Sequence, residues 1–464
     1  MQRRTVKVDV AVLGAGTSGA NVAYQLAAQG SSVVLVERRA LDEGGAQWHN
    51  GLLDWQVARA HLPLPAPPER VSDGGALHLF DPDGRRGVTV THNPVPSVDM
   101  ARLGARLRRL GAEAGVEMWE RASDLEVEER DGRIVALDLR AAPVGGAPVP
   151  LRLEAALFVD ASGRRGALRR ESSVLHRWCP PVRKDELCSA SDSHLRIGDT
   201  DGAKRFLNRF GVEAGDAVNV VGTNGGFSTR SIKVAEDFEH VSVLVGCLAD
   251  GRHGHAPAML AAVRAQEPWI GEPVQSGTGV ISLRRPYARL TAPGLALVGE
   301  AAGQVFPAHG SGIGVGLIAG RVLAEAVAGA DDPGDEAVLW GYQARFQREL
   351  GGLLAAYDGL RRLSSALGGE GVRTMLRAGL VTERMTHSGL DQRWDAVPVA
   401  ELPALASRLA RHPRLAATML PRLAGAQGAE AMGRRHPATI DERALARWDR
   451  RVAWLVGDRA PMRS

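Results

Sequence analysis

Residues 8–37 read VDVAVLGAGTSGANVAYQLAAQGSSVVLVE, and the order of patterns in this stretch decides the fold. The apolar run 8–13 predicts a buried strand, and residues 20–28 follow with a helical pattern. A second apolar run, 33–36, closes on Glu37. A strand, a glycine-rich turn, a helix and a second strand form a βαβ unit of the dinucleotide-binding type.

The glycine-rich turn supplies backbone groups suited to a diphosphate. It consists of Gly14, Ala15, Gly16, Thr17, Ser18 and Gly19. Gly14 permits a tight turn, Gly16 lets the backbone approach a pyrophosphate, and Gly19 lets helix and strand pack closely. The free N–H groups of the helix start lie at the positive end of the helix dipole. Glu37 follows about 20 residues later, where an acid accepts hydrogen bonds from ribose hydroxyls. The stretch predicts a site for the adenosine diphosphate part of a dinucleotide.

Composition narrows the class of protein. The 464 residues are enough for two or three domains, and 44% hydrophobic with 24% charged residues is typical of a soluble globular chain. The net charge of +4 is small, and no lysine-rich tail is present, so nucleic acid is not an expected partner. We expect no signal peptide and no membrane span, since the longest uncharged stretch, 301–320, is rich in glycine. The few cysteines, Cys179, Cys188 and Cys247, predict a reduced, cytoplasmic protein without a metal site.

The remaining patterns predict a discontinuous architecture. Turn residues 81–84 separate two strand-like runs, 77–80 and 87–91, and predict a hairpin. Alternating strands between 218 and 248 predict a mainly antiparallel sheet with one face on a ligand cavity. The predicted parts are a first cofactor-domain segment at 1–175 with an insertion at 61–95, a substrate domain at 176–279, a second cofactor-domain segment at 280–330, and a helical region at 331–464.

Another motif, called the third motif because one at 159–169 precedes it in the chain, lies in the second cofactor-domain segment. An acid, Glu300, follows a predicted strand at 295–300, and a glycine-rich stretch then opens a helix at 313–330. The acid can hold a ribose or ribityl hydroxyl, and the N–H groups of the helix start can face a carbonyl or a developing anion. An ordinary strand–loop–helix connection is the alternative for this motif taken alone.

Taken in order, three segments resemble FAD-dependent oxidoreductases of the p-hydroxybenzoate hydroxylase fold. They are GAGTSG with Glu37, VDASGRRGALR at 159–169, and LALVGEAAGQVFPAHGSGIG at 295–314. The last segment resembles the geranylgeranyl-reductase branch. This resemblance implies FAD as cofactor and an α/β fold: a Rossmann-type FAD-binding domain, a mainly antiparallel β-sheet substrate domain and a helical C-terminal region.

The chain departs from the family pattern in three places. Glu300 replaces the usual Asp of the third motif, and its longer side chain should still reach a hydroxyl. Ser162 and Gly166 replace the Asp and Ser of the middle motif, which weakens the expectation that NADPH binds directly. Arg102 stands in for the arginine that relatives place at the start of a long helix. NAD(P)H remains a candidate transient reductant, and an electron-donor protein is a candidate partner.

The resemblance also implies which residues bind FAD and which act in catalysis. The expected cofactor-binding residues are Gly14, Ala15, Gly16, Thr17, Ser18, Gly19, Glu37, Arg38, Gln47, Trp48, Arg102, Ala161, Ser162, Gly163, Gly299, Glu300, Gly310, Ser311, Gly312 and Ile313. His49 and His309 are the candidate catalytic residues, expected to flank the reactive edge of the flavin and to titrate near neutral pH. The plainer alternatives are a solvated loop residue for His49 and a capping residue for His309. Arg284 and Arg285 are expected on a solvated face, and a site for an acidic substrate is the alternative.

These features predict a flavin-dependent reductase or dehydrogenase that transfers a hydride between flavin N5 and an organic substrate, for which a secondary metabolite and a lipid-like molecule are the candidates. A monooxygenase that hydroxylates or epoxidises its substrate is the second interpretation, and a non-catalytic flavin-binding or maturation protein is the third. The substrate and the oligomeric state are not indicated by the sequence.

Overall fold

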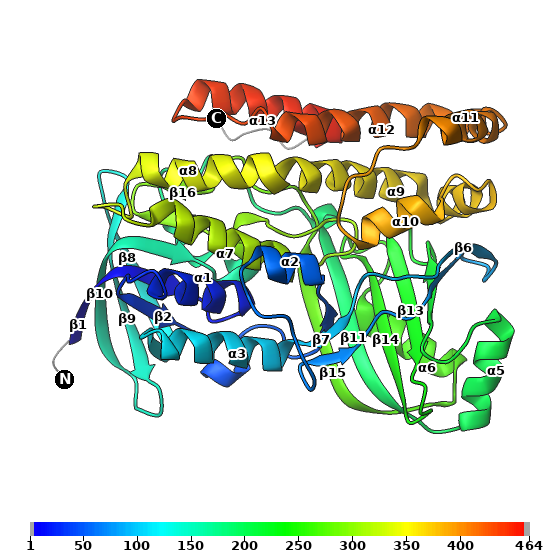
Figure 1. Cartoon of the computed structure of the whole chain (residues 1–464), viewed down its shortest axis with the longest axis horizontal. Coiled ribbons are helices and arrows are strands. Elements are labelled where there is room, and N and C mark those ends of the chain that lie inside the picture. The colour runs from blue at the N-terminus through cyan, green and yellow to red at the C-terminus, as the bar shows by residue number, and fades with distance from the viewer. Residues whose placement is uncertain (1–3, 459–464) are drawn as a thin grey trace.

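A computed structural model describes residues 4–458. Two large sheets lie side by side, and helices from the C-terminal part cover them from one side (Figure 1). The mixed α/β class and the helical C-terminal region predicted from the sequence are confirmed. None of the helices in the described chain combines the length and the apolar character needed to cross a lipid bilayer.

The first sheet carries the predicted βαβ unit. Its strands are β1 (Arg4–Leu13), β2 (Val33–Val36), β8 (Glu117–Arg130), β9 (Arg133–Pro143), β10 (Val149–Asp160), β16 (Thr291–Ala292) and β17 (Leu295–Leu297). The pairs β8–β2, β2–β1, β1–β10 and β10–β17 are parallel, whereas β8, β9 and β10 form an antiparallel meander. The centre of the sheet is buried on both faces, which explains its continuous apolar runs.

Helix α1 (Thr17–Ala27) packs against β1 and β2 of this sheet, and two further helices, α3 (Met100–Glu113) and α7 (Ile313–Val327), pack against α1. Gly320 allows α7 to approach α1, because a Cβ there would lie 2.9 Å from the Asn21 side chain and 3.3 Å from the Cα of Val22. Short segments follow the strands: η1 (Leu41–Glu43), η2 (Gly163–Arg165), α4 (Ala167–Glu171) and η4 (Gly299–Ala302).

The second sheet is mainly antiparallel. Its strands, in spatial order, are β15 (Ile270–Ser282), β11 (Leu187–Ile197), β14 (His240–Leu248), β13 (Ser228–Val234), β12 (Ala217–Val221), β5 (Leu77–Phe80) and β6 (Arg86–Val90). The helices α5 (Thr200–Phe210) and α6 (Ala256–Gln266) cover one of its faces, and η3 (Lys184–Glu186) precedes β11. The hairpin predicted at 77–91 is confirmed by β5 and β6.

Strand alternation gives the second sheet two different faces. In β14, the side chains of Val241, Val243 and Val245 are fully buried in the core with α5 and α6. The residues between them face the opposite way, where Leu244 is 42% exposed and lines a cavity. The expectation of one core face and one ligand-facing face agrees with this arrangement.

The strands within 61–95 belong to other sheets than that of the cofactor domain. β5 and β6 extend the second sheet by parallel pairing of β5 with β12. A small sheet of β3 (His49–Gly51), β7 (Ser97–Asp99) and β4 (Arg70–Ser72), together with α2 (Asp54–Arg59), connects the two large sheets. The strand predicted at 295–300 is shorter than expected, because β17 ends at Leu297 and Glu300 lies in η4.

The C-terminal region forms two helical layers over the sheets (Figure 1). Its elements are α8 (Glu336–Phe346), η5 (Gln347–Gly351), α9 (Gly352–Arg377), α10 (Glu383–Leu390), η6 (Val399–Glu401), α11 (Leu402–Ala410), α12 (Pro413–Gly433) and α13 (Glu442–Val456). Trp448 of α13 is buried, and its indole N–H donates to the carbonyl of Met432 in α12 (2.8 Å).

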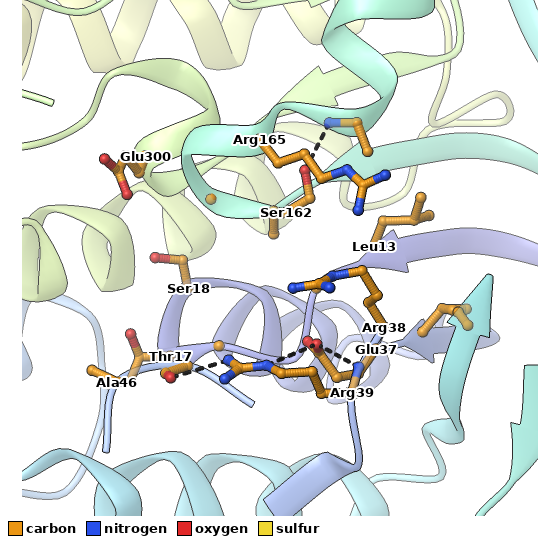
Figure 2. A pocket seen from close by; sticks show the side chains of 18 of the residues that line it. Leu13, Thr17, Ser18, Glu37, Arg38, Arg39, Ala46, Ser162, Arg165 and Glu300 are labelled. Carbon is orange, nitrogen blue, oxygen red and sulfur yellow. Dashed lines mark hydrogen bonds and ion pairs between the residues drawn. The ribbon is translucent and has the colours of Figure 1, made fainter. Parts of the chain in front are cut away.

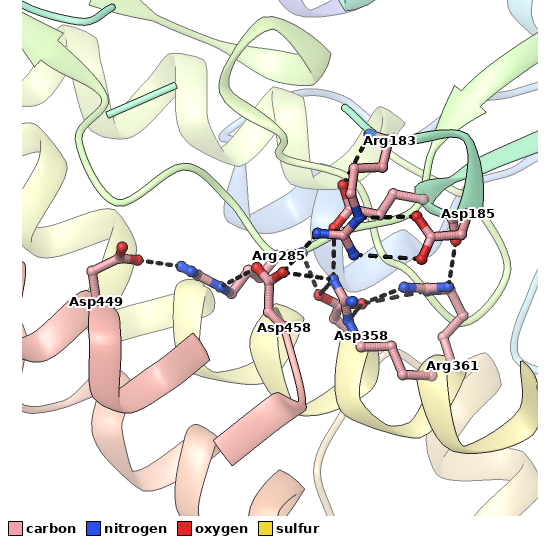
Figure 3. A network of polar contacts seen from close by, with 9 residues as sticks. Arg183, Asp185, Arg285, Asp358, Arg361, Asp449 and Asp458 are labelled. Atoms are coloured by element: carbon pink, nitrogen blue, oxygen red, sulfur yellow. Dashed lines mark hydrogen bonds and ion pairs between the residues drawn. The ribbon is translucent and has the colours of Figure 1, made fainter. Parts of the chain in front are cut away.

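A buried ion-pair network fastens the C-terminal layer to the sheets (Figure 3). Asp358 of α9 is fully buried, and its carboxylate accepts hydrogen bonds from Arg361 (2.9 Å) and Arg362 (3.0 Å). Arg285 donates to Asp449 of α13 (2.6 Å) and lies 3.6 Å from Asp458. The expectation of a solvated face is wrong for both arginines, because Arg284 is 4% and Arg285 is 5% exposed.

We expect Asp358→Asn to destabilise the folded holoenzyme by about 3–5 kcal/mol, because it leaves buried arginines without their counter-charge. The arginines also hold the pKa of Asp358 below its ordinary value, so this contribution is present above the unfolded-state pKa of about 4 and is lost as the pH falls. Urea unfolding at fixed excess FAD measures both effects.

Asp185→Asn is the matched control, since Asp185 belongs to the same network but is 51% exposed. It should cost less than about 1 kcal/mol. Equal costs for the two variants would contradict the idea that the buried charges fasten the layer.

Candidate functional site

A cavity of about 840 Å³ lies at the carboxyl ends of the parallel strands. Leu13, Val36 and Ala161 line it where β1, β2 and β10 end, and Glu300 faces it from η4 (Figure 2). Parallel α/β sheets bind ligands at this edge, where loops from neighbouring strands meet. The three sequence motifs therefore meet at one cavity although they lie far apart in the chain.

The glycines of the first turn are required by close packing. Gly14 has a φ of +103°, and a Cβ at this position would lie 2.4 Å from the carbonyl oxygen of Ala161. A Cβ on Gly19 would lie 1.8 Å from the oxygen of Gly14. Gly16 differs, because its φ is −66° and a Cβ there would lie 3.5 Å from the nearest protein atom, in Gly45. The protein itself thus has room for a side chain at Gly16, in the wall of the cavity.

The start of α1 faces this cavity without a side-chain cap. Thr17 and Ser18 line the cavity, and the first N–H groups of a helix have no partners within the helix. Four arginines also line it: Arg38, Arg39, Arg121 and Arg165. The helix start and these arginines supply positive charge suited to a diphosphate, in a cavity that Glu37, Asp124 and Glu300 also line.

Glu37 is buried and already holds two backbone groups. Its Oε2 accepts the N–H of Ala15 (2.8 Å), and its Oε1 accepts the N–H of Arg39 (3.1 Å). An ionised carboxylate offers about four acceptor sites, so two remain for ribose hydroxyls. Glu37 therefore shapes the turn as well as lining the cavity.

The middle motif is organised by Asp160, which the sequence analysis did not single out. Its buried carboxylate accepts the N–H groups of Leu168 (2.9 Å) and Arg169 (2.8 Å), at the start of α4. The Ser162 hydroxyl donates to the other oxygen of Asp160 (2.6 Å). Ala161, Ser162 and Gly163 line the cavity. An acid at the end of a buried strand was the available signal for Asp160.

In the third motif, Glu300 is held by the second sheet. The N–H of Ser282, at the end of β15, donates to its Oε1 (2.9 Å), and burial raises the pKa of the Glu300 carboxyl. Gly312 and Ile313 line the same cavity as Glu300, whereas Gly310 and Ser311 line the neighbouring cavity over the second sheet. The glycine-rich stretch thus forms the wall between two cavities.

Several expected cofactor residues do not line the cavity. Arg102 is 57% exposed and lies 3.3 Å from Asp99. The Gln47 side chain donates to carbonyls of its own loop, at Asp42 and Gly44. Instead of Arg102, the buried Arg108 points inward from α3, and its guanidinium donates to the carbonyl of Ala15 (3.2 Å). The remaining three, Ala15, Gly19 and Gly299, act through the backbone and packing next to the cavity wall.

The cofactor cavity adjoins a second cavity over the inner face of the second sheet. Trp48, Gly279 and Ile281 line both. The second cavity has a polar branch of about 970 Å³ and an apolar branch of about 640 Å³, which share residues including Leu244 and Ile281. We call the position of Trp48, Gly279 and Ile281 the junction.

Both candidate histidines line the second cavity. His49 follows Trp48 and lines the polar branch, while His309 lines both branches next to the Gly310–Gly312 wall. Burial lowers the pKa of His49, and it lowers the pKa of His309 to about 4. The lowered pKa of His309 departs from the expectation that this histidine titrates near neutral pH. The His309 side chain is exposed where it lines the two branches.

Comparisons with known proteins agree with this geometry. Residues 9–175 match the family described as FAD dependent oxidoreductase. The protein therefore contains an FAD-dependent oxidoreductase domain. It is 24% identical over 375 residues to digeranylgeranylglycerophospholipid reductase 1 of Methanopyrus kandleri, covering 74% of this chain and 87% of the relative. It is 27% identical over 394 residues to the reductase of that name from Methanothrix thermoacetophila, covering 80% and 91%.

Solved structures show the same fold. A geranylgeranyl bacteriochlorophyll reductase-like protein from Thermoplasma acidophilum has a TM-score of 0.70 at 17% identity, covering 89% of this chain and 98% of that one. A probable FAD-dependent monooxygenase from Pseudomonas aeruginosa has a TM-score of 0.55 at 18% identity, covering 81% and 100%. The fold is therefore shared by reductases and monooxygenases.

The residues of the cofactor cavity fit FAD. The free helix start, the cationic lining and the space beside Gly16 suit a diphosphate, and Glu37 and Glu300 retain acceptor sites for hydroxyls. The junction gives a flavin ring at the far end of the dinucleotide a route to the second cavity.

We expect Gly16→Ala to fold but to bind FAD at least about tenfold more weakly, because the methyl group would stand between the diphosphate and the N–H groups of α1. FAD stoichiometry and dissociation constants measure this effect, with circular dichroism as the folding check. Gly341→Ala in α8 is the control, because a Cβ there meets nothing within 4 Å. Full FAD occupancy in Gly16→Ala would show that the turn does not hold the diphosphate.

Proposed function

We propose that the protein is an FAD-dependent reductase that adds hydrogen to a small, mostly apolar unsaturated molecule held over the second sheet. The observation that carries this proposal is the junction, where the cofactor cavity meets a cavity with an apolar branch. The relatives named as reductases of geranylgeranyl lipids support a substrate with an apolar, unsaturated chain.

The proposed roles of the cofactor-binding residues follow from their positions. The N–H groups at Gly16, Thr17 and Ser18 bind the diphosphate, and Glu37 accepts hydrogen bonds from ribose hydroxyls. Glu300 accepts a hydrogen bond from a hydroxyl nearer the flavin ring. Bound FAD supplies hydride chemistry, while the protein orients the substrate and controls charge.

The apolar branch is suited to holding an extended hydrocarbon. Its lining includes Leu77 and Phe227 from the sheet side, and Val372, Leu376 and Leu390 from the C-terminal helices. Such a lining removes apolar surface from water, at about 25 cal/mol per Å². It also keeps water from the reacting carbons when the branch is filled.

The proposed role of the histidines changes with their lowered pKa values. At pH 7 a neutral His309 offers a hydrogen bond and a ring surface, and it is a poor store of protons. The Nε2 atom of His309 lies 3.4 Å from the carbonyl of Gly389, which holds the ring at the cavity wall. We therefore assign His49 and His309 to substrate positioning. The source of electrons, NAD(P)H or an electron-donor protein, remains a prediction.

The monooxygenase interpretation is the competing one, because the fold is shared with a probable monooxygenase. The two functions differ in the atoms that the product gains. Reduction adds two hydrogens to each reacting double bond, and oxygenation adds one oxygen atom from O₂.

We expect dithionite-reduced holoenzyme to hydrogenate geranylgeraniol or geranylgeranylamine under anaerobic conditions. In air with ¹⁸O₂, the product should carry no label. Mass spectrometry of the extracted products measures both. Labelled product formed only in air would support the monooxygenase instead. A Gly16→Ala variant, depleted of FAD, is the control for non-enzymatic reduction.

A further inference from the structure

Asp192 is a carboxylate on the cavity face of the second sheet. Its neighbours in β11, Ser191 and Ser193, are buried on the opposite face of the sheet. Asp192 and His194 line the polar branch. Its cross-strand partners are Leu244 in β14 and Gly277 in β15. No side chain stands at Gly277, so the space directly across from Asp192 is open to another group.

The ring of Trp48 borders that space. A Cβ on Gly277 would lie 2.3 Å from Cε3 of Trp48, and a Cβ on Gly279 would lie 3.6 Å from its Cη2. Cross-strand neighbours on one face have Cβ atoms about 4.5–5.5 Å apart. The indole ring is therefore the neighbour of Asp192 at the junction, where the polar branch begins.

Asp192 has no cationic partner. Within residues 4–458, no lysine, arginine or histidine forms an ion pair with it, although this chain pairs most of its buried acids with arginine. Desolvation raises the pKa of the Asp192 carboxyl to about 7, while a backbone hydrogen bond from Ser193 opposes the shift. A carboxylate in such a place is stabilised when a cation enters.

The other acids of the polar branch add to the negative charge. They are Asp73, Asp216, Glu236 and Asp237. Asp216 accepts a hydrogen bond from His78 (3.0 Å), and Asp73 lies 2.7 Å from Arg70. Glu236 and Asp237 are exposed at the rim of the branch.

The same branch also contains basic groups, which are four histidines and one lysine, Lys233. Burial lowers the pKa values of His49, His194 and Lys233, and that of His309 to about 4. Lys233 stands two residues along β13 from the position level with Asp192, and its ammonium donates to the Ser72 hydroxyl (3.3 Å). The ring of His240 stacks on His194 at 4.7 Å between centroids, on the side away from the junction. Carboxylates therefore dominate the charge of the branch.

We propose that the polar branch binds an organic cation, an amine or ammonium group on an otherwise apolar substrate, between the Asp192 carboxylate and the Trp48 ring. The carboxylate provides the counter-charge, and the indole face provides a cation–π contact. This inference rests on the proposed function, since it names the substrate class of the same cavity. An anionic phosphate head would instead meet Asp192 and the acidic rim.

Isothermal titration of the oxidised holoenzyme tests the proposal without turnover. The probes are n-octyltrimethylammonium, n-octanol and n-octyl phosphate, each below the concentration at which it aggregates. At pH 8 the ammonium probe should bind roughly tenfold or more tightly than the phosphate probe. Lowering the pH from 8 to 6 should weaken ammonium binding by roughly tenfold, because Asp192 takes up a proton.

Asp192→Asn should lose both the preference and the pH dependence, while Asp192→Glu should keep them. Asp201→Asn on the exposed surface of α5 is the matched control and should change neither. Retained FAD content confirms that a variant is folded. If a variant does not fold, the preference of the wild-type protein for the ammonium probe over the phosphate probe still tests the proposal. Phosphate binding that equals ammonium binding would overturn the proposal, and so would a pH dependence that persists in Asp192→Asn. The titration measures binding to the oxidised protein and no product. Its outcome is therefore independent of whether the reductase proposal holds.

Discussion

The close contact between Gly14 and the carbonyl of Ala161 is the constraint on which the site depends. It places the first turn against the end of β10 at a distance that no side chain permits. As a result, the start of α1 and the middle motif lie on the same cavity. Asp160, at the end of β10, fixes the Ala161 side of this contact, because its carboxylate accepts hydrogen bonds from the start of α4. The cofactor cavity is therefore built by backbone packing, and its side chains add charge and hydrogen-bond acceptors.

The second sheet turns this cavity into a site for a reaction. Its strands alternate between a valine-rich face packed on α5 and α6 and a mixed face that lines the second cavity. The glycines of β15 leave room for Trp48, so the loop after the first βαβ unit reaches the sheet. The junction thus results from contacts between segments that are distant in sequence.

The local parts of this arrangement could be predicted from sequence because they depend on short-range patterns. The glycine turn, Glu37 and the hairpin at 77–91 all have local signatures. Arg108 and Arg102 show the limit: both lie on one arginine-rich helix, and only tertiary packing decides which one turns inward. Asp192 carries no motif, because its environment comes from Gly277 and Trp48. Likewise, a glycine-rich motif does not reveal that the pKa of His309 is lowered.

The central claim is that the dinucleotide site and the cavity over the second sheet meet at Trp48, Gly279 and Ile281. A crystal structure of the FAD-bound protein tests this claim most directly. The account predicts the diphosphate at the start of α1, with the flavin ring at the junction and one edge open to the cavity that contains His309 and Asp192. A flavin ring that turns away from Trp48 and Ile281, toward solvent beside Arg38 and Arg121, would contradict it.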